Sequence, residues 1–563
     1  MPDSSPAPMR RRSLFKVAGL GAVGAAGLPF AAACSDIDSN EGSAQQTEGF
    51  DFLPEHKEWP LPAEPDLVGE PPNHPSAFTS YPEPIEAVTE VPSNSGTYEI
   101  TVPFWGEAPS NDDPYFTALR DAWGGTTVNL RQADGNTYAD TSVQWLNANE
   151  YGDGILLFSW MLGSHTNFPE TVVNSFYDLT DILKGDISER WPLLAGLPTQ
   201  SWAQSVWSTD PTDPETARLY GIPSTFSGGP GNALFTRVDL MEAASIAMPT
   251  TVEELLEACR TWSDDANGKW AFGSVDWILP QLFGLVGDEG WNWDEAQGKL
   301  IHDCEKPEFT EMLEFRRTLW DEKLIHPDAP TGTLDNGALQ IAGTTLFSQE
   351  NPVRWYEYTS KVKDGSATGA IVPVPPIAAK GRKPALKANT SVDGWTFLNK
   401  DLSKEQVEEL LDVANWCSAP FGTKEYELLE YGVEGDHFEY DATGNPVHTE
   451  HGQKIVQAPV NLKQYSGKVQ RFLTGLPEVV QAHFEFNASC QEYIVPGIFS
   501  GVRIEAPAVF KSANQVFNDQ QNDIAFGRAE LSTIPDIVAT FMENGGEEAR
   551  GFFTDVYKSL NEE

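Results

Sequence analysis

Tryptophans placed at the ends of strand-like runs are the residues of this sequence best suited to recognising a ligand. The chain of 563 residues contains 17 tryptophans, and several of them follow strand-like runs rather than lying on helical faces. An exposed indole stacks on the apolar C–H face of a sugar ring, while neighbouring polar side chains hydrogen-bond the ring hydroxyls. The candidates for stacking are Trp105, Trp160, Trp277, Trp355 and Trp395. For each of them, packing in a hydrophobic core is an equally open interpretation.

Polar residues close to these tryptophans in the sequence are the candidate partners for sugar hydroxyls. They are Asp276, Gln349, Asn351, Arg354 and Asp393. Other tryptophans recur at helical spacing among apolar residues, which is typical of a core position. These core tryptophans are Trp123, Trp262, Trp320 and Trp416.

Familiar catalytic patterns are missing from the body of the chain. Outside the apolar N-terminal run there is no G-x-S-x-G, H-E-x-x-H, P-loop or G-x-G-x-x-G pattern, so common hydrolase, zinc protease and nucleotide-binding classes have no starting point. A glycoside hydrolase needs only a pair of carboxylates, and 83 acidic residues offer many pairs. A secreted enzyme acting on polysaccharides therefore stays open as the alternative.

The N-terminus predicts export followed by lipid attachment. Arg11 and Arg12 precede an apolar run that ends at residue 33 and is too short to span a bilayer, so 1–33 is interpreted as a twin-arginine signal peptide. Small residues lead into Cys34, which predicts acylation there, for example by palmitate, and stable anchoring to the cell membrane by the attached chains. An ordinary cleaved signal is the alternative. Residues 34–96 are polar and then proline-rich, as expected of an extended tether.

The charge of the chain limits its partners. Its formal net charge is −46 at pH 7, which argues against nucleic acid and against a polyanionic sugar, because a strongly acidic surface repels both. Neutral or cationic ligands fit better. With 40% hydrophobic residues and this length, the chain is able to build two or more cores.

Periodicity predicts an α/β domain at the start of the body. Apolar and polar residues alternate through "TYEITVPFW" (97–105), and further strands are expected at 126–132 and at the apolar run "GDGILLFSW" (152–160). Helices are expected between them, at 115–123 and 137–150. Strands that alternate with helices predict a largely parallel sheet with helices on both faces.

Further along, three amphipathic helices are predicted. They lie in 249–262, 306–324 and 403–418, and Thr251 and Glu254 have the spacing of a capping box at the start of the first. Short strand-like runs at 343–347 and 369–376 separate these helices.

In order and spacing, several stretches resemble the extracellular solute-binding lipoproteins (family 1) of carbohydrate ABC transporters, in particular the long alginate-type and pectic-oligosaccharide binders. The matching stretches are "FYDLTDIL", "LYGIPSTF", "LFTRVDLMEAASIAMPTTVEELLEACRTW", "GKLIHDCEKPEFTEMLEFRRTLWDEKLIHPD", "GVEGDHFEYDATGNPV" and "DIAFGRAELSTIPDIVATFMENGGEEARGFFTDVY". They are spread along the chain between Thr97 and Leu560.

The resemblance implies a type II-like Venus flytrap fold, in which two α/β lobes close around a ligand about a hinge. By that analogy 97–223 plus 336–376 form the N-terminal lobe, and 224–335 plus 377–563 form the C-terminal lobe. The resemblance also implies a monomer that captures a neutral oligosaccharide and delivers it to an ABC transporter permease, with no catalytic step.

Metal and disulfide chemistry have little support in the sequence. Long members of that family often carry a calcium loop, and here the matching stretch offers only Asp264, Asp265 and Asn267, fewer oxygen ligands than calcium needs. His448 and His451 lack an obvious third ligand, so no metal and no cofactor are predicted. No C-x-x-C pair occurs; Cys259 and Cys417 are expected to be packed thiols, and pairing among Cys259, Cys304, Cys417 and Cys490 is left open.

Overall fold

The computed structural model describes residues 43–70, 74–88, 95–105, 108–165, 167–210, 213–225, 229–362, 371–388, 392–456 and 472–561. The predicted signal peptide, Cys34 and the first part of the tether lie outside these residues. Within the described ranges, no helix has both the length and the apolar character needed to cross a membrane.

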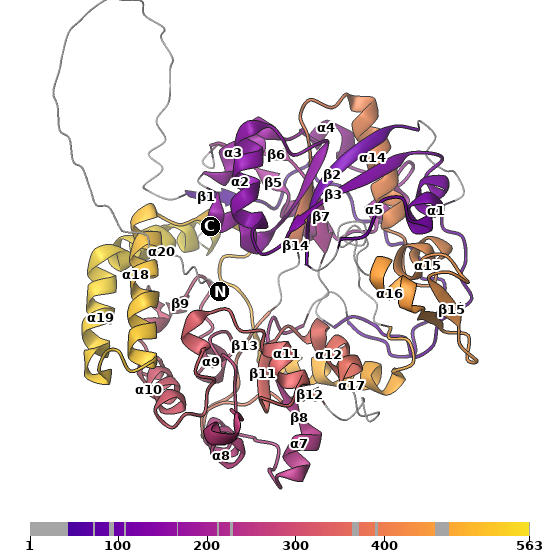
Figure 1. The fold of residues 1–563 in the computed structure, drawn as a ribbon. Helices are drawn as coiled ribbons and strands as arrows, with labels where there is room; N and C mark the ends of the chain where they lie inside the picture. Colours follow the sequence, from indigo (N-terminus) through magenta and orange to yellow (C-terminus); the bar gives the residue numbers. More distant parts are fainter. Residues whose placement is uncertain are drawn as a thin grey trace, which may run out of the picture. The chain divides into compact units, whose positions relative to one another are not determined.

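The first sheet has five strands in the order β3-β2-β4-β14-β7 (Figure 1). Its strands are β2 (Thr97–Phe104), β3 (Thr127–Asp134), β4 (Gly154–Phe158), β7 (Ile222–Thr225) and β14 (Val392–Leu398). β2 pairs in parallel with β3 and β4, whereas β14 runs antiparallel to β4 and β7. All five residues of β4 are buried, as expected for an apolar run at the centre of a sheet. The three strands predicted at the start of the body are thus confirmed.

The predicted helices of this region are also confirmed, as α1 (Pro114–Ala122), α2 (Tyr138–Ala148) and α14 (Lys404–Cys417). A buried carboxylate holds α14 to the sheet: Glu409 accepts hydrogen bonds from Gly96 N (2.8 Å), the Tyr98 hydroxyl (2.7 Å) and the Thr126 hydroxyl (2.6 Å). The other helices and strands packed around this sheet are α3 (Phe168–Ser175), α4 (Thr180–Leu183), α5 (Pro192–Ala195), α6 (Thr199–Ala203), β5 (Val206–Trp207) and β6 (Arg218–Leu219). Together they enclose the first hydrophobic core.

A second sheet has three strands in the order β11-β8-β12, with β8 at Ala233–Arg237, β11 at Phe347–Glu350 and β12 at Ile371–Pro373. A separate hydrophobic core lies near it. That core packs helices α7 (Val238–Ala243), α8 (Val252–Trp262), α9 (Leu279–Leu282), α10 (Pro307–Asp321), α18 (Ala508–Ala525), α19 (Ile534–Phe541) and α20 (Glu547–Asn561). α8 begins as predicted, with the Thr251 side chain accepting from Glu254 N, but the Glu254 carboxylate accepts from Thr250 instead of closing the capping box.

The observed pairing differs from the predicted allocation of 336–376 to the N-terminal lobe. Both strands inside that segment, β11 and β12, pair with β8, because β8 offers one edge to each. The first sheet instead takes β14 as its later strand, from a segment that we expected in the C-terminal lobe. We therefore propose lobes centred on the two sheets, with 336–376 belonging to the second.

The remaining elements extend these two cores. They are β1 (Ser43–Gln46), β9 (Trp291–Asp294), β10 (Lys299–His302), α11 (Asn336–Ile341), α12 (Trp355–Lys361), β13 (Leu386–Lys387), α15 (Lys424–Tyr431), β15 (Phe438–Tyr440), β16 (Pro446–His448), α16 (Glu450–Ile455), α17 (Pro477–Cys490), β17 (Ile494–Val495) and β18 (Val502–Glu505).

The proline-rich segment, expected to be an extended tether, lies against the folded body. Phe52 is buried in the first core, and Phe78 and Tyr81 pack around Phe421 in a smaller cluster. Earlier in the segment, β1 pairs antiparallel with β18. The described part of the predicted tether is therefore attached to the protein at several points.

Candidate functional site

Two exposed tryptophans meet at the carboxyl ends of the parallel strands of the first sheet. Trp105 directly follows β2 and is 45% exposed, and Trp160 lies in the 3-10 turn Ser159–Ser164 after β4 and is 59% exposed. β2 and β4 are parallel neighbours, so their carboxyl ends reach the same edge. Ligands of open α/β sheets bind outside this edge.

Trp105 and Trp160, with the buried ring of Phe158 packed against both, form an aromatic surface that we call the first platform. The rings of Phe158 and Trp160 are stacked, with centroids 6.2 Å apart and an interplanar angle of 9°. Trp105 lies 6.4 Å from each of them. A Cβ at Gly135, just after β3, would lie 2.1 Å from the Trp105 ring, so only glycine allows the indole this position. Phe158 is only 4% exposed, so it supports the two tryptophans and does not itself face a ligand.

A carboxylate lies beside the first platform. Asp393 occupies a β-bulge at the start of β14, between Val392, which pairs with Thr225, and Gly394, which pairs with Phe158. Burial raises the pKa of Asp393 to about 6. The neighbouring Thr225 hydroxyl oxygen is buried and has no hydrogen-bond partner among the described residues. Of these two groups, the half-buried Asp393 is the one that hydroxyls of a ligand could reach.

The second sheet holds a third exposed tryptophan. Trp277 is 59% exposed, and the loop that carries it is fixed by Gln349 on β11. The Gln349 side-chain oxygen accepts from Trp277 N (2.7 Å) and from Ile278 N (3.0 Å). Gln349 itself is only 1% exposed, so it positions Trp277 and is not itself placed to contact a ligand.

Asp276, the neighbour of Trp277, is half-exposed and is engaged by Arg316 on α10, which also donates to the Asn522 side-chain oxygen (2.9 Å). Burial lowers the pKa of Arg316, and the charge of Asp276 opposes that shift. A basic group beside Trp277 is thus already neutralised by a carboxylate.

Two predicted stacking residues are core residues in this structure. Trp355 is 2% exposed, and its indole N–H donates to Ile371 O at 2.5 Å. Trp395 is 5% exposed and packs edge-on against Trp207. Neither presents a ring face to a ligand. Alternation along β14 turns the Trp395 indole toward packed neighbours, and Trp355 lies on the inner face of α12. All four tryptophans predicted as core residues pack against a core, with Trp320 only partly buried.

The last two predicted polar residues serve mainly local structure. The Asn351 side chain accepts from Val353 N and caps the short turn Pro352–Arg354. Arg354 pairs with Glu357 at 2.5 Å.

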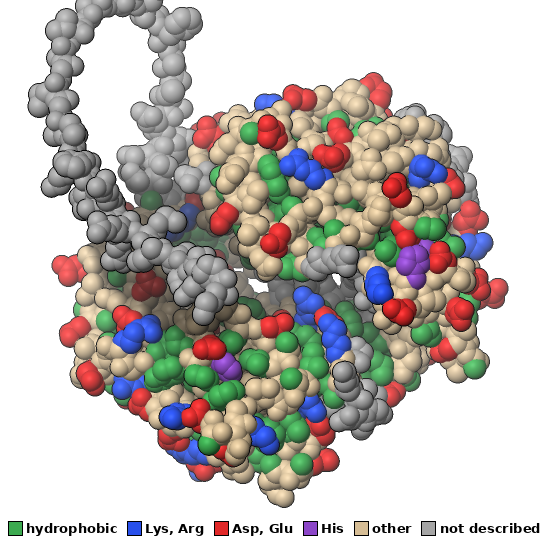
Figure 2. Space-filling view, in the orientation of Figure 1, with side chains coloured by type: hydrophobic (Ala, Val, Ile, Leu, Met, Phe, Trp, Pro, Cys, Tyr) green, Lys and Arg blue, Asp and Glu red, His purple; other side chains and the backbone are tan. Residues whose placement is uncertain are grey.

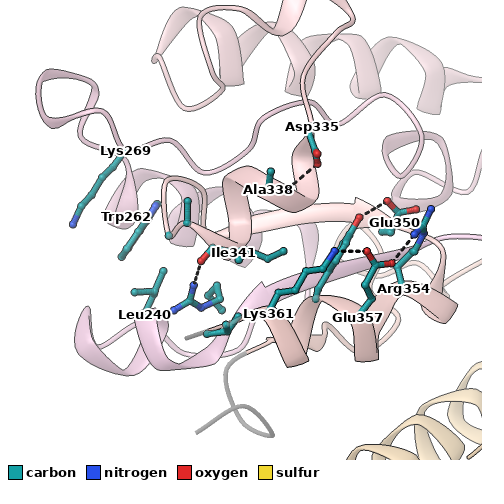
Figure 3. Close-up of a pocket in the computed structure, with 15 residues that line it drawn as sticks. Leu240, Trp262, Lys269, Asp335, Ala338, Ile341, Glu350, Arg354, Glu357 and Lys361 are labelled. Atoms are coloured by element: carbon teal, nitrogen blue, oxygen red, sulfur yellow. Dashed lines mark hydrogen bonds and ion pairs between the residues drawn. The ribbon is translucent and has the colours of Figure 1, made fainter. Parts of the chain in front are cut away.

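A pocket of about 950 Å³ lies near Arg354, among the helices close to the second sheet (Figure 3). It runs from Trp262 and Lys269 at one end, past α11, to the group Glu350, Arg354, Glu357 and Lys361 at the other, and the Glu357 carboxylate pairs with both Arg354 and Lys361. Among the site residues predicted from the sequence, only Arg354 lines it. This pocket is therefore a second candidate site, and seven of its 15 lining residues are charged.

A histidine cluster was missed by sequence reasoning. His437 Nε2 lies 2.9 Å from one oxygen of Asp113, and His451 Nε2 lies 3.0 Å from the other. These three residues could gather round a metal, but His437 Nδ1 accepts from Val433 N. That bond leaves the ring proton on Nε2, the atom that would have to bind the metal. The cluster therefore fits a hydrogen-bonded ion pair better than a metal site, and 324 residues separate Asp113 from His437, so no local pattern pointed to it.

The ionisation of this cluster follows from its contacts. Burial acts to raise the pKa of Asp113, but the hydrogen bond from Tyr115 N and the two histidines lower it overall. Hydrogen bonding to Asp436, together with the charge of Asp113, raises the pKa of His451.

In the stretch that corresponds to the calcium loop of the long family members, the carboxylates are engaged by protein groups. Asp265 accepts from Trp270 Nε1 and from Lys323, and Asp264 accepts from Asn267. The four cysteines after residue 258 are all buried and free, so Cys259 and Cys417 are packed thiols, as predicted.

Comparison with known proteins identifies the fold. No protein-family model and no curated protein sequence matches this chain. This chain resembles three solved structures, and the match covers 100% of the chain of each. They are the N-glycan transport solute binding protein NgtS from Streptococcus pneumoniae (12% identity, 83% of this chain, TM-score 0.59), the HMO-binding ABC-transporter-associated solute binding protein from Bifidobacterium longum infantis (13%, 84%, 0.58) and the alginate-binding protein AlgQ2 (13%, 84%, 0.57).

These likenesses show that the chain has the two-lobe, Venus flytrap-like α/β fold of solute-binding proteins. The predicted fold class is thus confirmed. We propose that the two cores and two sheets described above correspond to the two lobes of that fold.

Proposed function

We propose that the protein is the extracytoplasmic substrate-binding component of an ABC importer and that it captures an oligosaccharide without chemical change. The observation that carries this proposal is the first platform, an exposed aromatic surface at the carboxyl edge of a parallel sheet, with Asp393 and Thr225 beside it. Indole faces and a few hydrogen-bonding groups are what a sugar-binding surface requires.

The similar structures support the same function. They include proteins named for binding N-glycans, HMO and alginate, all of them ligand-binding proteins. Trp277 on the second sheet would supply a further stacking face, and closure of the two lobes would bring it toward the first platform. The saccharide would then pass to permease subunits in the membrane.

Export and lipid attachment at Cys34 would place this binding protein outside the cytoplasm and next to its permease. The prediction is that replacement Cys34→Ser releases the exported protein from the membrane fraction. The export signal and the binding site are separate parts of this proposal, so one is testable without the other.

The decisive experiment incubates the full-length mature chain with an array of oligosaccharides, followed by calorimetry and mass spectrometry of each ligand that binds. The expected result is binding with 1:1 stoichiometry and recovery of intact sugar. Release of shortened sugars would instead establish the alternative, a carbohydrate-active enzyme. Absence of binding to every saccharide would refute the function.

A further inference from the structure

The structure assigns a specificity role to Asp393, and we propose that it makes the saccharide site selective for charge. Asp393 favours a sugar that carries a protonated amino group, accepts a neutral sugar, and excludes a sugar carboxylate. This inference rests on the proposed saccharide-binding function and adds a substrate class to it.

The strand register places Asp393 next to the first platform, one residue before the pair formed by Gly394 and Phe158. Val392 and Gly394 pair with consecutive residues of β7, Thr225 and Ser224, so Asp393 is the extra residue of a bulge. A bulge interrupts the alternation of a strand and re-aims the side chain that it carries. A Cβ at Gly394 would lie 2.6 Å from Leu157 O and 3.0 Å from the Phe158 ring. The glycine thus brings β14 against β4 where the platform begins.

The carboxyl group of Asp393 lacks a counter-charge. Burial is the cause of its raised pKa, and no lysine, arginine or histidine of the described residues forms an ion pair with it. A half-buried carboxylate without a partner is costly, and a cation supplied by a ligand removes that cost. A ligand carboxylate at the same place would add a second negative charge and would be repelled.

The surroundings of Asp393 also favour a cationic sugar over an anionic one. An ammonium group is attracted to the faces of aromatic rings such as Trp105 and Trp160. The chain has a net charge of −46, and acidic side chains are spread over the face of the molecule in Figure 2. Arg316, the basic residue beside Trp277, is already paired with Asp276, so it does not recruit an anionic sugar.

The test uses oligosaccharides of equal length that differ in charge: a cello-oligosaccharide, the corresponding fully deacetylated chito-oligosaccharide, and an oligouronate, within a wider array of neutral, amino and acidic glycans. The full-length mature chain is compared with Asp393→Asn and with Asp401→Asn. Asp401 lies beyond the opposite end of β14, is exposed and accepts a hydrogen bond from Asn149, so this control removes the same charge away from the platform.

For the wild type and Asp401→Asn we expect affinity to rise by about tenfold or more from the neutral to the amino sugar, which is ~1.4 kcal/mol, with no binding of the oligouronate. Asp393→Asn should lose that preference while keeping its affinity for neutral sugars within about threefold. Circular dichroism and thermal unfolding establish that both variants are folded.

Two failures are distinguishable. If saccharides bind and Asp393→Asn keeps the charge preference of the wild type, or if the wild type binds acidic glycans as well as amino ones, the role of Asp393 is refuted and the proposed function stands. If no glycan of the array binds the wild type, the proposed function has failed and this inference fails with it.

Discussion

Replacement of Trp160 by alanine tests the first platform directly. Trp160 is 59% exposed, and a tryptophan offers at most about 250 Å² to its surroundings, so roughly 150 Å² is accessible. A sugar ring covers one face of the indole, or roughly 75 Å², and at about 25 cal/mol per Å² this burial contributes ~2 kcal/mol. The expected loss of affinity for Trp160→Ala is therefore about 30-fold.

The assay is calorimetric titration with the saccharide that binds best to the wild type, together with thermal unfolding of the free protein. Trp145→Ala is the matched control, because Trp145 is a half-buried indole on α2 whose ring faces Arg131 instead of the platform. We expect its affinity to match the wild type. An unchanged affinity in Trp160→Ala, with a normal unfolding transition, would refute the stacking role of the platform.

Three further predictions concern stability. Glu409→Ala should lower the free energy of unfolding by about 3 kcal/mol, because two buried donors and one half-buried donor lose their acceptor. Denaturant titration measures this, and a loss below about 0.5 kcal/mol would contradict it. Trp355→Phe should cost about 1 kcal/mol through the lost hydrogen bond to Ile371 O and should leave saccharide affinity unchanged, whereas weaker binding would restore Trp355 to the site. The raised pKa of His451 predicts that this residue stabilises the fold below pH 6.5 and that the stabilisation is lost as the pH rises through the folded-state pKa. Since His451 is 43% exposed, screening by solvent keeps the stabilisation below about 1 kcal/mol. Comparison of unfolding in wild type and His451→Ala at pH 6 and pH 9 checks it, and an equal difference at both pH values would count against the ion pair with Asp113.

Local patterns predicted the elements and part of the site. The alternation in 97–105 and the apolar run ending at Phe158 predicted β2 and β4. The positions of Trp105 and Trp160 at the ends of these strands made them candidates for stacking, and both are exposed. Periodicity is sufficient for this prediction, because the carboxyl ends of neighbouring parallel strands lie at the same edge of the sheet.

Contacts between distant segments were not predictable in the same way. Nothing near Trp355 or Trp395 distinguishes a buried indole from an exposed one, because burial depends on partners such as Ile371 O and Trp207 from other elements. The strand that completes the first sheet, β14, comes from a segment that local patterns do not connect with β4. Gly394 permits the close approach of β14 and β4, and this role can be recognised only once that pairing is known.

The position of a bound saccharide tests the account most directly. A crystal structure of the full-length mature chain with the best ligand from the glycan array should show sugar rings against the faces of Trp105 and Trp160, with intact glycosidic bonds and a hydroxyl or amino group at Asp393. A saccharide bound instead in the pocket between Trp262 and Lys361, away from all three of these residues, would contradict it.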